Sequence, residues 1–182
     1  MNIIFDKWYN IGQNMIALTW LLLTNPLLQT EPILDVFFKA FLPQGRSNTE
    51  QLSAYFYNKI KPRLEENQYT ITVWDQDNLV AFAVFEKWEE QSYYLAEMAV
   101  LPEYQRKGIG KQLVFSIFDK DQEASKILLI TEKTNKWSQA FYEKIGFRRS
   151  FFQHPNYPEN FIGYEFYRCK DILKTPALLI VS

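Results

Sequence analysis

The spacing of apolar residues changes along this chain, and each change predicts a different element. From Tyr69 to Trp74, apolar and polar residues alternate with a period of two, which is typical of a half-buried strand. Residues 75–78, Asp-Gln-Asp-Asn, form a turn signal, and the run from Leu79 to Phe85 is apolar on both faces. This run predicts a central strand, followed by a charged turn over Glu86 to Ser92.

A strand, a glycine loop and a helix start follow in unbroken succession, and the rest of the chain is arranged around them. The strand runs from Tyr93 to Leu101 and ends at Pro102, which has no amide to donate to a sheet. Gly108 and Gly110 come next, and a helix is predicted from Gly108 to about Asp121. Its apolar residues recur at helical spacing, at Ile109, Leu113, Val114, Ile117 and Phe118.

Three shorter elements complete the second half of the chain. Lys126 to Thr131 predicts a buried strand that runs parallel to the strand before the glycine loop, through a right-handed crossover. Asn135 to Ile145 predicts a helix that ends at Gly146. Two final strands, Phe147 to Phe152 and Phe161 to Arg168, flank the loop His154 to Asn160. The tail over residues 173–182 is predicted either to pair as an edge segment or to lie loose.

The first third of the chain gives a more ambiguous pattern, above all over residues 1–30. Met15 to Leu28 fits either a first strand or a short buried helix. Thr30 to Phe41 predicts a helix that ends at Pro43 and Gly45. Ser47 to Glu66 predicts a second helix, capped by Ser47 or Thr49 and kinked near Lys61 by Pro62.

Length and composition limit the classes of function. A chain of 182 residues is long enough for one domain, over residues 1–182, and too short for two comfortable ones. A formal charge of -1 argues against a nucleic-acid binder driven by phosphate contacts. Cys169 is the only cysteine and His154 the only histidine, so neither an internal disulfide nor a usual zinc site is expected. We expect no bound metal and a reducing, cytoplasmic compartment.

Targeting signals are not predicted either. The most apolar segment, Met15 to Leu23, is interrupted by Thr19 and stopped by Asn25-Pro26, which makes it too short to span a bilayer. The residues before it lack a clear basic region, and no small-residue cleavage site follows. We therefore predict neither a signal peptide nor a membrane partner.

The glycine loop is the strongest candidate for a binding site. A helix that begins directly after a strand presents amides that have no partner inside the helix, and its end carries about half a positive charge. Such an end favours a phosphate or pyrophosphate. Gly108 and Gly110 let a bulky anion approach the main chain, and Arg106, Lys107 and Lys111 add positive charge. A plain strand-to-helix turn is the alternative interpretation of the two glycines alone.

Two other phosphate motifs do not fit, and a third does. A dinucleotide fingerprint needs a glycine where Leu113 stands, and a Walker loop needs one where Gln105 stands. Gln105-Arg106-Lys107-Gly108-Ile109-Gly110 resembles the Gln/Arg-x-x-Gly-x-Gly/Ala pyrophosphate loop of the GNAT superfamily of acyl-CoA-dependent N-acyltransferases. Leu95 to Tyr104 looks like the fourth strand of that family. Asn135 to Phe147 is similar to its Asn-x-x-Ala-x-x-Phe-Tyr-Glu-x-x-Gly-Phe segment, with Ser138 where alanine is usual.

This resemblance is convincing from about Tyr69 to Arg168, and it implies a fold. The family fold is of the α/β (α+β) class: a mixed, mostly antiparallel central sheet of six to seven strands flanked by about four helices. By this analogy we prefer a strand around Ile16 to Leu23 over a helix. The family also has a bulge that separates the strand before the glycine loop from the parallel strand that follows, here Ile127 to Ile130.

The resemblance also implies how acetyl-CoA would bind. Its pyrophosphate would lie over the amides of the glycine loop, and its pantetheine arm would pair with main-chain groups near Met98 and Val100. Asn135 either caps its helix alone or also contacts the cofactor, and Lys136 and Lys144 either meet the nucleotide phosphate or are solvated. The expected cofactor-binding residues are Met98, Ala99, Val100, Gln105, Arg106, Lys107, Gly108, Ile109, Gly110, Lys111 and Asn135.

Two side chains are expected to carry the chemistry. Acyl transfer needs a neutral amine, and Glu97 lies just ahead of the thioester site, where it would take the amine proton directly or through water. Glu86 is the reserve, and a solvent-facing or lysine-paired Glu97 is the alternative. Tyr142 coincides with the family's usual acid, and a phenol with a pKa of about 10 stays protonated at pH 7. It would donate to the departing thiolate, with plain packing as the alternative.

The acceptor pocket of the family lies between its first helices and the final loop. Tyr55, Phe56 and Tyr57 are therefore candidates for substrate contact, with core or surface packing as the more ordinary role. His154 would lean over the same pocket or lie at the surface. Cys169 shows no activating pair and is expected to be structural.

The function implied is transfer of an acetyl group from acetyl-CoA to a primary amine of a small molecule or peptide, by direct attack and without a covalent enzyme intermediate. Two alternatives stay open. One is a non-catalytic acyl-CoA-binding or sensing module, and the other is an RNA-directed acetyltransferase that acts on aminoacyl-tRNA. The latter needs a basic stripe that the overall charge does not suggest. The acceptor and the acyl-chain preference are not identified, and a homodimer is one of the assemblies that the sequence allows.

Overall fold

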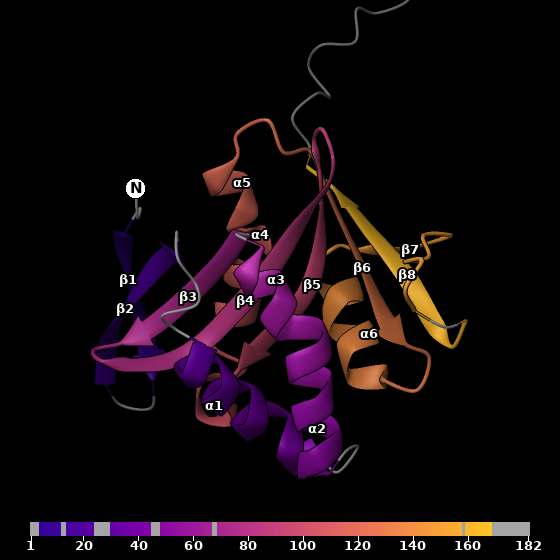
Figure 1. Ribbon diagram of the computed structural model, residues 1–182. Coiled ribbons are helices and arrows are strands. Elements are labelled where there is room, and N and C mark those ends of the chain that lie inside the picture. The colour runs from indigo at the N-terminus through magenta and orange to yellow at the C-terminus, as the bar shows by residue number, and fades with distance from the viewer. Residues whose placement is uncertain are drawn as a thin grey trace, which may run out of the picture.

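One eight-stranded sheet forms the centre of the described part of the chain, with strand order β1-β2-β3-β4-β5-β6-β8-β7 (Figure 1). The computed structural model describes residues 4–11, 14–23, 30–44, 48–66, 69–157 and 159–168, and of 4–23 the backbone only. The strands are β1 (Ile4–Ile11), β2 (Asn14–Leu23), β3 (Tyr69–Asp75), β4 (Asn78–Glu89), β5 (Ser92–Val100), β6 (Lys126–Glu132), β7 (Arg148–Ser150) and β8 (Phe161–Tyr167).

Neighbouring strands run antiparallel except at β5 and β6, which are parallel. The crossover between these two passes through α4 (Ile109–Phe115) and α5 (Ile117–Lys120). The predicted mixed, mostly antiparallel sheet is therefore confirmed, but it has eight strands and not the expected six to seven. The strand expected around Ile16 to Leu23 lies within β2, and the described chain adds β1, which pairs with β2 along its whole length.

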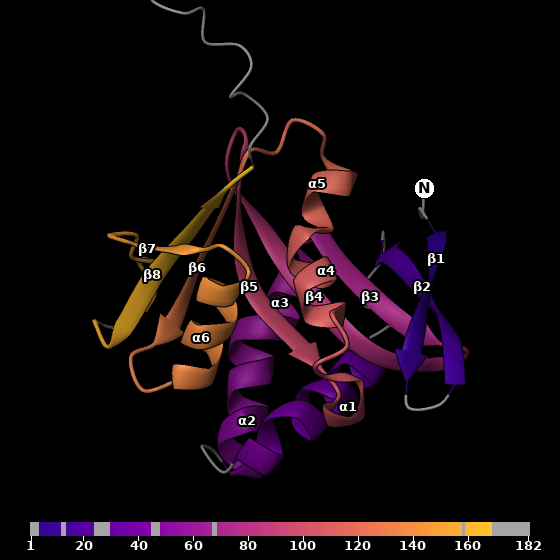
Figure 2. The ribbon, with the colours of Figure 1, turned by 180° about the vertical axis from the view of Figure 1, so that it is seen from behind.

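Helices cover both faces of the sheet. On one face lie α1 (Thr30–Phe41), α2 (Thr49–Tyr55) and α3 (Lys61–Glu65), which are in front in Figure 1. The crossover helices α4 and α5 come to the front when the molecule is turned around (Figure 2), and α6 (Lys136–Lys144) lies with them. A hydrogen bond of 2.9 Å from the Tyr164 hydroxyl of β8 to Glu143 ties α6 to that face.

The second helix differs in detail from its prediction. Its cap is Asn48, whose side chain accepts from the Gln51 amide at 2.8 Å, and not Thr49; Ser47 and Gly45 lie outside the described residues. Before Pro62 the chain forms a π-helical turn, η3 (Phe56–Ile60), in which the Lys61 amide bonds to the Phe56 carbonyl. In this turn the amide bonds to the carbonyl five residues back instead of four, just before Pro62, which has no amide to donate.

The core centres on β4. Residues 80–85 of this strand are at most 1% exposed, as expected for a strand that is apolar on both faces. The predicted charged turn over Glu86 to Ser92 is wrong in extent, because β4 continues to Glu89 and β5 begins at Ser92. The two strands keep pairing through Lys87 with Tyr93 and Glu89 with Ser92, so only residues 90 and 91 form the turn.

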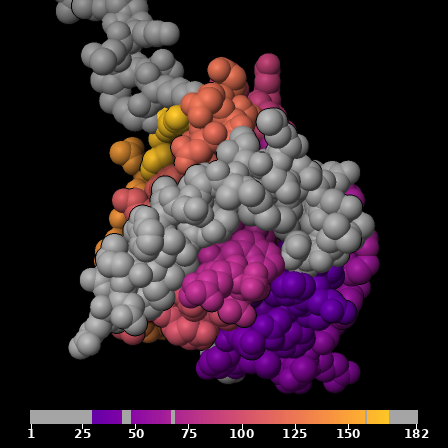
Figure 3. Space-filling model, turned by 90° about the vertical axis from the view of Figure 1, so that its left-hand side faces the viewer, coloured from indigo at the N-terminus to yellow at the C-terminus, as the bar shows by residue number. Residues whose placement is uncertain are grey.

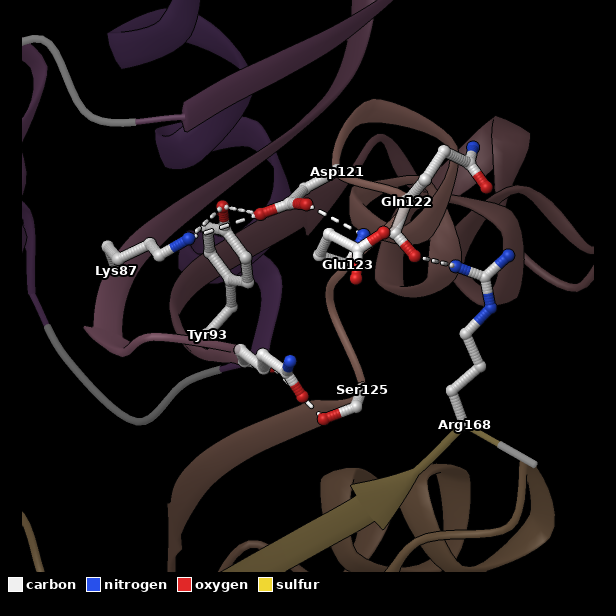
Figure 4. A network of polar contacts seen from close by, with 8 residues as sticks. Lys87, Tyr93, Asp121, Gln122, Glu123, Ser125 and Arg168 are labelled. Atoms are coloured by element: carbon white, nitrogen blue, oxygen red, sulfur yellow. Dashed lines mark hydrogen bonds and ion pairs between the residues drawn. The ribbon is translucent and has the colours of Figure 1, made fainter. Parts of the chain in front are cut away.

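A polar network fixes the base of the crossover (Figure 4). The Tyr93 hydroxyl donates to Asp121 at 2.7 Å, and Lys87 lies 3.2 Å from the same carboxylate oxygen. Arg168 donates to the carbonyls of Phe118 at 3.1 Å and Gln122 at 3.4 Å. These contacts join the β4–β5 hairpin, the end of α5 and the end of β8, and so hold β5 beside β6 at this end of the sheet.

The first of the two final strands is shorter than predicted, and the loop after it begins earlier. β7 stops at Ser150 instead of Phe152, and the chain then crosses β8 at Gly163. A Cβ on Gly163 would lie 2.1 Å from the Phe152 carbonyl oxygen, so only glycine allows this crossing. Gly146 ends α6 with a φ of 104°, as predicted. Cys169 and the 173–182 tail lie outside the described residues.

The edge of the molecule beside α1 carries one hollow. In Figure 3, α1 lies next to the β3–β4 turn. A cavity of about 480 Å³ there has Asp35, Lys39, Trp74, Asp77 and Glu103 among its lining residues. Among the helices described, none is long and apolar enough to cross a bilayer.

Candidate active site

β5 and β6 separate halfway along their length, and this separation opens one edge of β5. The two strands pair only through Ser92, Tyr93 and Tyr94 of β5. Beyond that point β6 continues with β8, while β5 stays with β4 (Figures 1 and 2). The β4–β5 register shifts so that Val84 opposes Glu97 and Phe85 opposes Leu95, which leaves Ala96 as the extra residue of a bulge. The bulge and the separation agree with the expectation from sequence.

The loop after β5 presents a run of backbone amides. The Gln105 amide bonds to the Pro102 carbonyl at 3.2 Å, and the Gln112 amide bonds to the Gly108 carbonyl at 3.1 Å. Between these two, within the described residues, no acceptor is recorded for the amides of Arg106 to Lys111. The start of α4 therefore offers consecutive donors to a group in front of it.

The two glycines of this loop have different roles. Gly108 has a φ of 86°, and a Cβ built on it would meet nothing within 4 Å. It therefore supplies a left-handed backbone and leaves open space in front of the loop. Gly110 is a packing residue, because a Cβ there would lie 3.3 Å from the Phe141 ring of α6 and 3.8 Å from the end of Met98. Arg106 also has a positive φ, of 60°.

Polar side chains of the loop divide into two groups. The Gln105 amide group donates to the Val100 carbonyl at 2.9 Å and so ties the loop to the end of β5. Lys107 turns back, with its ammonium bonded to the Glu103 carbonyl and 5.8 Å from the centre of the Tyr104 ring. Arg106 and Lys111 are exposed. Of the three predicted cations, these two remain available to a phosphate.

Glu97 lies on the open edge of β5. Its carboxylate accepts a hydrogen bond from the Met98 amide at 3.2 Å. Burial raises the pKa of Glu97 to about 7, although the hydrogen bonds from Met98 and Tyr55 and the charge of Arg63 act in the opposite direction. A carboxylate that titrates near neutral pH is suited to exchange protons with an amine.

Tyr142 lies on α6, within electrostatic range of Glu97. Its ring packs against Phe147 at 5.6 Å and Tyr164 at 6.3 Å between ring centres. Burial, and then the negative charge of Glu97, raise the pKa of Tyr142 above its ordinary value. The phenol therefore stays protonated, and the charge of the proposed base acts on the proposed acid.

Asn135 is a helix cap. Its side-chain oxygen accepts from the Ser138 amide at 3.1 Å at the start of α6. Sequence reasoning missed its neighbour Gln139, which is 3% exposed and donates to the carbonyls of Glu132 at 3.0 Å and Lys133 at 2.9 Å. Gln139 thus fixes the turn from β6 into α6. Lys136 reaches Gln139 at 3.4 Å, and Lys144 is exposed.

A partly buried ion pair lies on the α1–α3 face, within electrostatic range of Glu97, and sequence reasoning missed it. Arg63 of α3 pairs with Glu86 of β4, and their side chains are 12% and 17% exposed. Arg63 also donates to the Lys59 carbonyl. Glu86, the reserve base, is thus engaged by an arginine, and Glu97 is the carboxylate on the open strand edge.

An aromatic layer from the final loop covers the same face. His154 is 5% exposed, with its ring 4.7 Å from Tyr94 and 5.0 Å from Tyr157. The surface alternative for His154 is therefore wrong, and burial lowers its pKa. The hydroxyl of Tyr157 is buried, and it interacts with Tyr55.

The predicted aromatics of the second helix differ from one another. Phe56 is fully buried in the core, and Tyr57 is 52% exposed. Tyr55 stacks on Phe37 with ring centres 6.1 Å apart and contacts Glu97. A cavity of about 250 Å³ lies at the final loop and not at these aromatics; it is lined by Ile130, Phe152, Gln153, His154, Pro155, Tyr157, Glu159 and Phe161.

Comparisons with known proteins agree with this geometry. The family model described as "Acetyltransferase (GNAT) family" matches residues 32–147. The N-alpha-acetyltransferase 30 of Schizosaccharomyces pombe (strain 972 / ATCC 24843) is 38% identical over 58 residues, which are 31% of this chain and 39% of that relative. The match thus spans about two fifths of the relative's length.

Solved structures share the fold. The PaiA N-acetyltransferase from Thermoplasma acidophilum, solved in complex with coenzyme A, superposes with a TM-score of 0.67 at 15% identity, over 82% of this chain and 99% of that one. The ribosomal-protein-S18-alanine N-acetyltransferase from Escherichia coli gives 0.60 at 17% identity, over 81% and 93%. From the family match and this shared fold, the chain belongs to the GNAT family of acetyltransferases.

Proposed function

We propose that this protein is an N-acetyltransferase that moves an acetyl group from acetyl-CoA to a primary amine of a small molecule or peptide. One observation carries the proposal. The amides of Arg106 to Lys111, for which the described residues supply no recorded acceptor, follow the open edge of β5, where Glu97 lies within electrostatic range of Tyr142. A diphosphate site, a strand edge and an acid–base pair are the three parts that acyl transfer from a CoA thioester requires.

The residues present fit the cosubstrate. The amides from Arg106 to Lys111 would hold the pyrophosphate, with Arg106 and Lys111 adding charge. The pantetheine arm carries amides, so it would pair with the main chain of Met98, Ala99 and Val100 along the edge that β6 leaves open. Asn135 would contribute by fixing the start of α6.

The amide of Met98 is the candidate donor to the thioester oxygen. It now donates to the Glu97 carboxylate. A carbonyl oxygen in the same position would develop negative charge as the amine attacks, and the Met98 amide would stabilise it. Glu97 would then be released to accept a proton from the amine, directly or through water.

Atoms and protons balance without a covalent enzyme intermediate. The amine nitrogen forms a bond to the thioester carbon, the carbon–sulfur bond breaks, and the sulfur leaves as a thiolate. Glu97 takes one proton from the nitrogen, and Tyr142 gives one to the sulfur. Proton exchange with water then restores both side chains.

The same residues give less support to the two alternative functions, an acyl-CoA sensor and an RNA-directed acetyltransferase. A non-catalytic acyl-CoA sensor has no need of a carboxylate with a pKa of about 7 within electrostatic range of a protonated phenol. An RNA-directed enzyme would want more positive charge than a net of -1 supplies. Peptide amines remain candidate acceptors, because the two similar proteins named above are an N-alpha-acetyltransferase and a ribosomal-protein-S18-alanine N-acetyltransferase. We infer that residues 1–182 form one domain and that it works in the cytoplasm.

Mass spectrometry of amine mixtures incubated with the protein and acetyl-CoA tests the proposal. We expect one or more amines to gain an acetyl group only when protein and acetyl-CoA are both present. Calorimetry on the same sample measures acetyl-CoA binding. Binding without acetylation of any amine, peptide N-termini included, would favour the sensor instead. The absence of binding would refute the loop assignment as well.

A further inference from the structure

The guanidinium of Arg63 has N–H donors that its recorded hydrogen bonds do not use, and the proposed chemistry does not involve this side chain. Resting on the proposed function, we propose that Arg63 binds a carbonyl or carboxylate oxygen close to the acceptor's amine. The acceptor would then be an α-amino acid unit, either free or at the N-terminus of a peptide, and not a simple amine or a polyamine. Arg63 would be a specificity-determining residue and would take no part in proton transfer.

The hydrogen bonds of Arg63 leave part of its guanidinium unused. A guanidinium has five N–H donors. Nε donates to Glu86 and Nη1 donates to the Lys59 carbonyl, and among the described residues no acceptor is recorded for Nη2. The Arg63 side chain is 12% exposed, so solvent reaches only a small part of it. A donor without a recorded acceptor on a mostly buried cation favours an oxygen ligand.

The position of Arg63 connects it to the proposed reaction centre. Arg63 pairs with Glu86, which opposes Tyr94 of β5. The Tyr94 ring lies 4.7 Å from His154 of the final loop. The charge of Arg63 also acts on Glu97. Arg63 also interacts electrostatically with Tyr157, whose hydroxyl is buried close to Tyr55. A ligand oxygen near Arg63 would therefore lie on the same side of the sheet as the amine that Glu97 deprotonates.

Charge separates the acceptor classes. An amine nitrogen near Glu97 and an oxygen near Arg63 would complement the two opposite charges of the site. A second ammonium group, as in a diamine, would meet a guanidinium that has few waters to screen it. Glu86 holds Nε, which fixes the planar fork, and a fixed fork discriminates an oxygen acceptor better than a lysine would.

Matched acceptors test this inference. Phenylalaninamide and phenethylamine share the side chain and the primary amine, and only the first has a carbonyl oxygen beside the amine. With the full chain and saturating acetyl-CoA, we expect kcat/KM for phenylalaninamide to exceed that for phenethylamine by about tenfold or more, because a site that bonds a polar group rejects the analogue without it. A diamine such as 1,5-diaminopentane should be the poorest acceptor.

Variants then assign the preference to Arg63. Arg63→Met with Glu86→Met removes both charges, which avoids an unpaired buried carboxylate. We expect the kcat/KM ratio of the two acceptors to fall close to one in this pair variant, and to be intermediate in Arg63→Lys, which keeps the charge and loses the fork. Arg149→Met is the matched control, because Arg149 also pairs with a glutamate, Glu143, at 3.1 Å, but is 61% exposed. The kcat/KM ratio of the two acceptors in Arg149→Met should equal the ratio in the wild type.

Folding and cosubstrate binding are checked by thermal melting and by acetyl-CoA calorimetry on every variant. A ratio near one in the wild type, or an unchanged ratio in a folded pair variant or in Arg63→Lys, overturns the assignment of Arg63. In either case acetylation would still occur, so the proposed function would stand. If neither acceptor nor any other amine is acetylated, the proposed function fails and the role of Arg63 falls with it.

Discussion

The Glu97 carboxylate accepts a hydrogen bond from the amide of Met98, its neighbour on β5, at 3.2 Å. This amide points away from β4, along the strand edge that β6 leaves after Tyr94. The Glu97–Met98 hydrogen bond therefore joins two neighbouring residues. It occupies an amide to which an extended ligand lying along β5 could otherwise bond. This hydrogen bond links thioester binding to proton transfer. A thioester oxygen that accepts from the Met98 amide would release the Glu97 carboxylate, which could then act as a base.

Glu97→Gln should lower kcat by about 10²–10⁴-fold, the usual contribution of a general base. The glutamine keeps the size of the side chain and can still accept from Met98, so acetyl-CoA affinity should change little. Glu90→Gln, at the exposed β4–β5 turn, is the control. Equal turnover in Glu97→Gln and wild type would remove the assignment of the base.

The pH dependence of the rate gives a separate test of Glu97. Only the ionised carboxylate accepts a proton, and its pKa is about 7, so the rate should rise with pH through that region. The amine acceptor also titrates, but it does so equally for both proteins. Dividing the wild-type profile by that of Glu97→Gln should therefore leave a single rise near pH 7. A flat quotient would contradict the prediction.

Tyr142→Phe should reduce kcat and leave the acetyl-CoA dissociation constant within about twofold, because the phenol donates only as the thiolate departs. The ring contacts with Phe147 and Tyr164 would remain, so stability should change little. Tyr167→Phe on β8, which is 59% exposed, is the control. Calorimetry and steady-state kinetics on the same preparations separate the two effects, and a kcat equal to wild type would exclude Tyr142 as the acid.

Gly108→Leu should weaken acetyl-CoA binding by about tenfold or more. Space around Gly108 is open within the protein, so the new side chain would occupy the region in front of the amides without clashing. Gly146→Ala controls for the cost of a side chain at positive φ, since Gly146 has a φ of 104° at the end of α6. If calorimetry shows unchanged affinity in Gly108→Leu, the amide site does not bind the diphosphate.

The local motifs were predictable, whereas contacts distant in sequence were not. The strand, loop and helix around Gly108 are consecutive residues, and the resemblance rests on them. Arg63 and Glu86 are 23 residues apart, and each looks like an ordinary surface charge until α3 packs on β4. His154 was expected at the surface as the more ordinary case, because nothing nearby in sequence indicates that its loop crosses β8 at Gly163. β1 was missed because residues 1–30 have no clear period.

Gly163→Ala should destabilise the fold by about 1–3 kcal/mol, because the Cβ would overlap the Phe152 carbonyl, which is backbone and cannot rotate away. The loop of residues 151–157 would have to lift from β8, and with it His154 and Tyr157. Thermal melting measures the first effect. The acceptor KM measures the second and should rise more than the acetyl-CoA dissociation constant. An unchanged melting temperature would contradict the tight crossing.

The last prediction concerns stability, and it follows from the same carboxylate. The folded pKa of Glu97, about 7, lies above the unfolded value of 4.5, so folding favours the protonated form. This contribution to stability is fully present below pH 4.5 and is lost as pH rises through 7. At pH 8 the ionised carboxylate therefore destabilises the native state, on the order of 1–3 kcal/mol. Glu97→Gln, which cannot ionise, should unfold at a higher urea concentration than wild type at pH 8, with a smaller difference at pH 5. A less stable variant at pH 8 would mean that Glu97 is not held in a desolvated position.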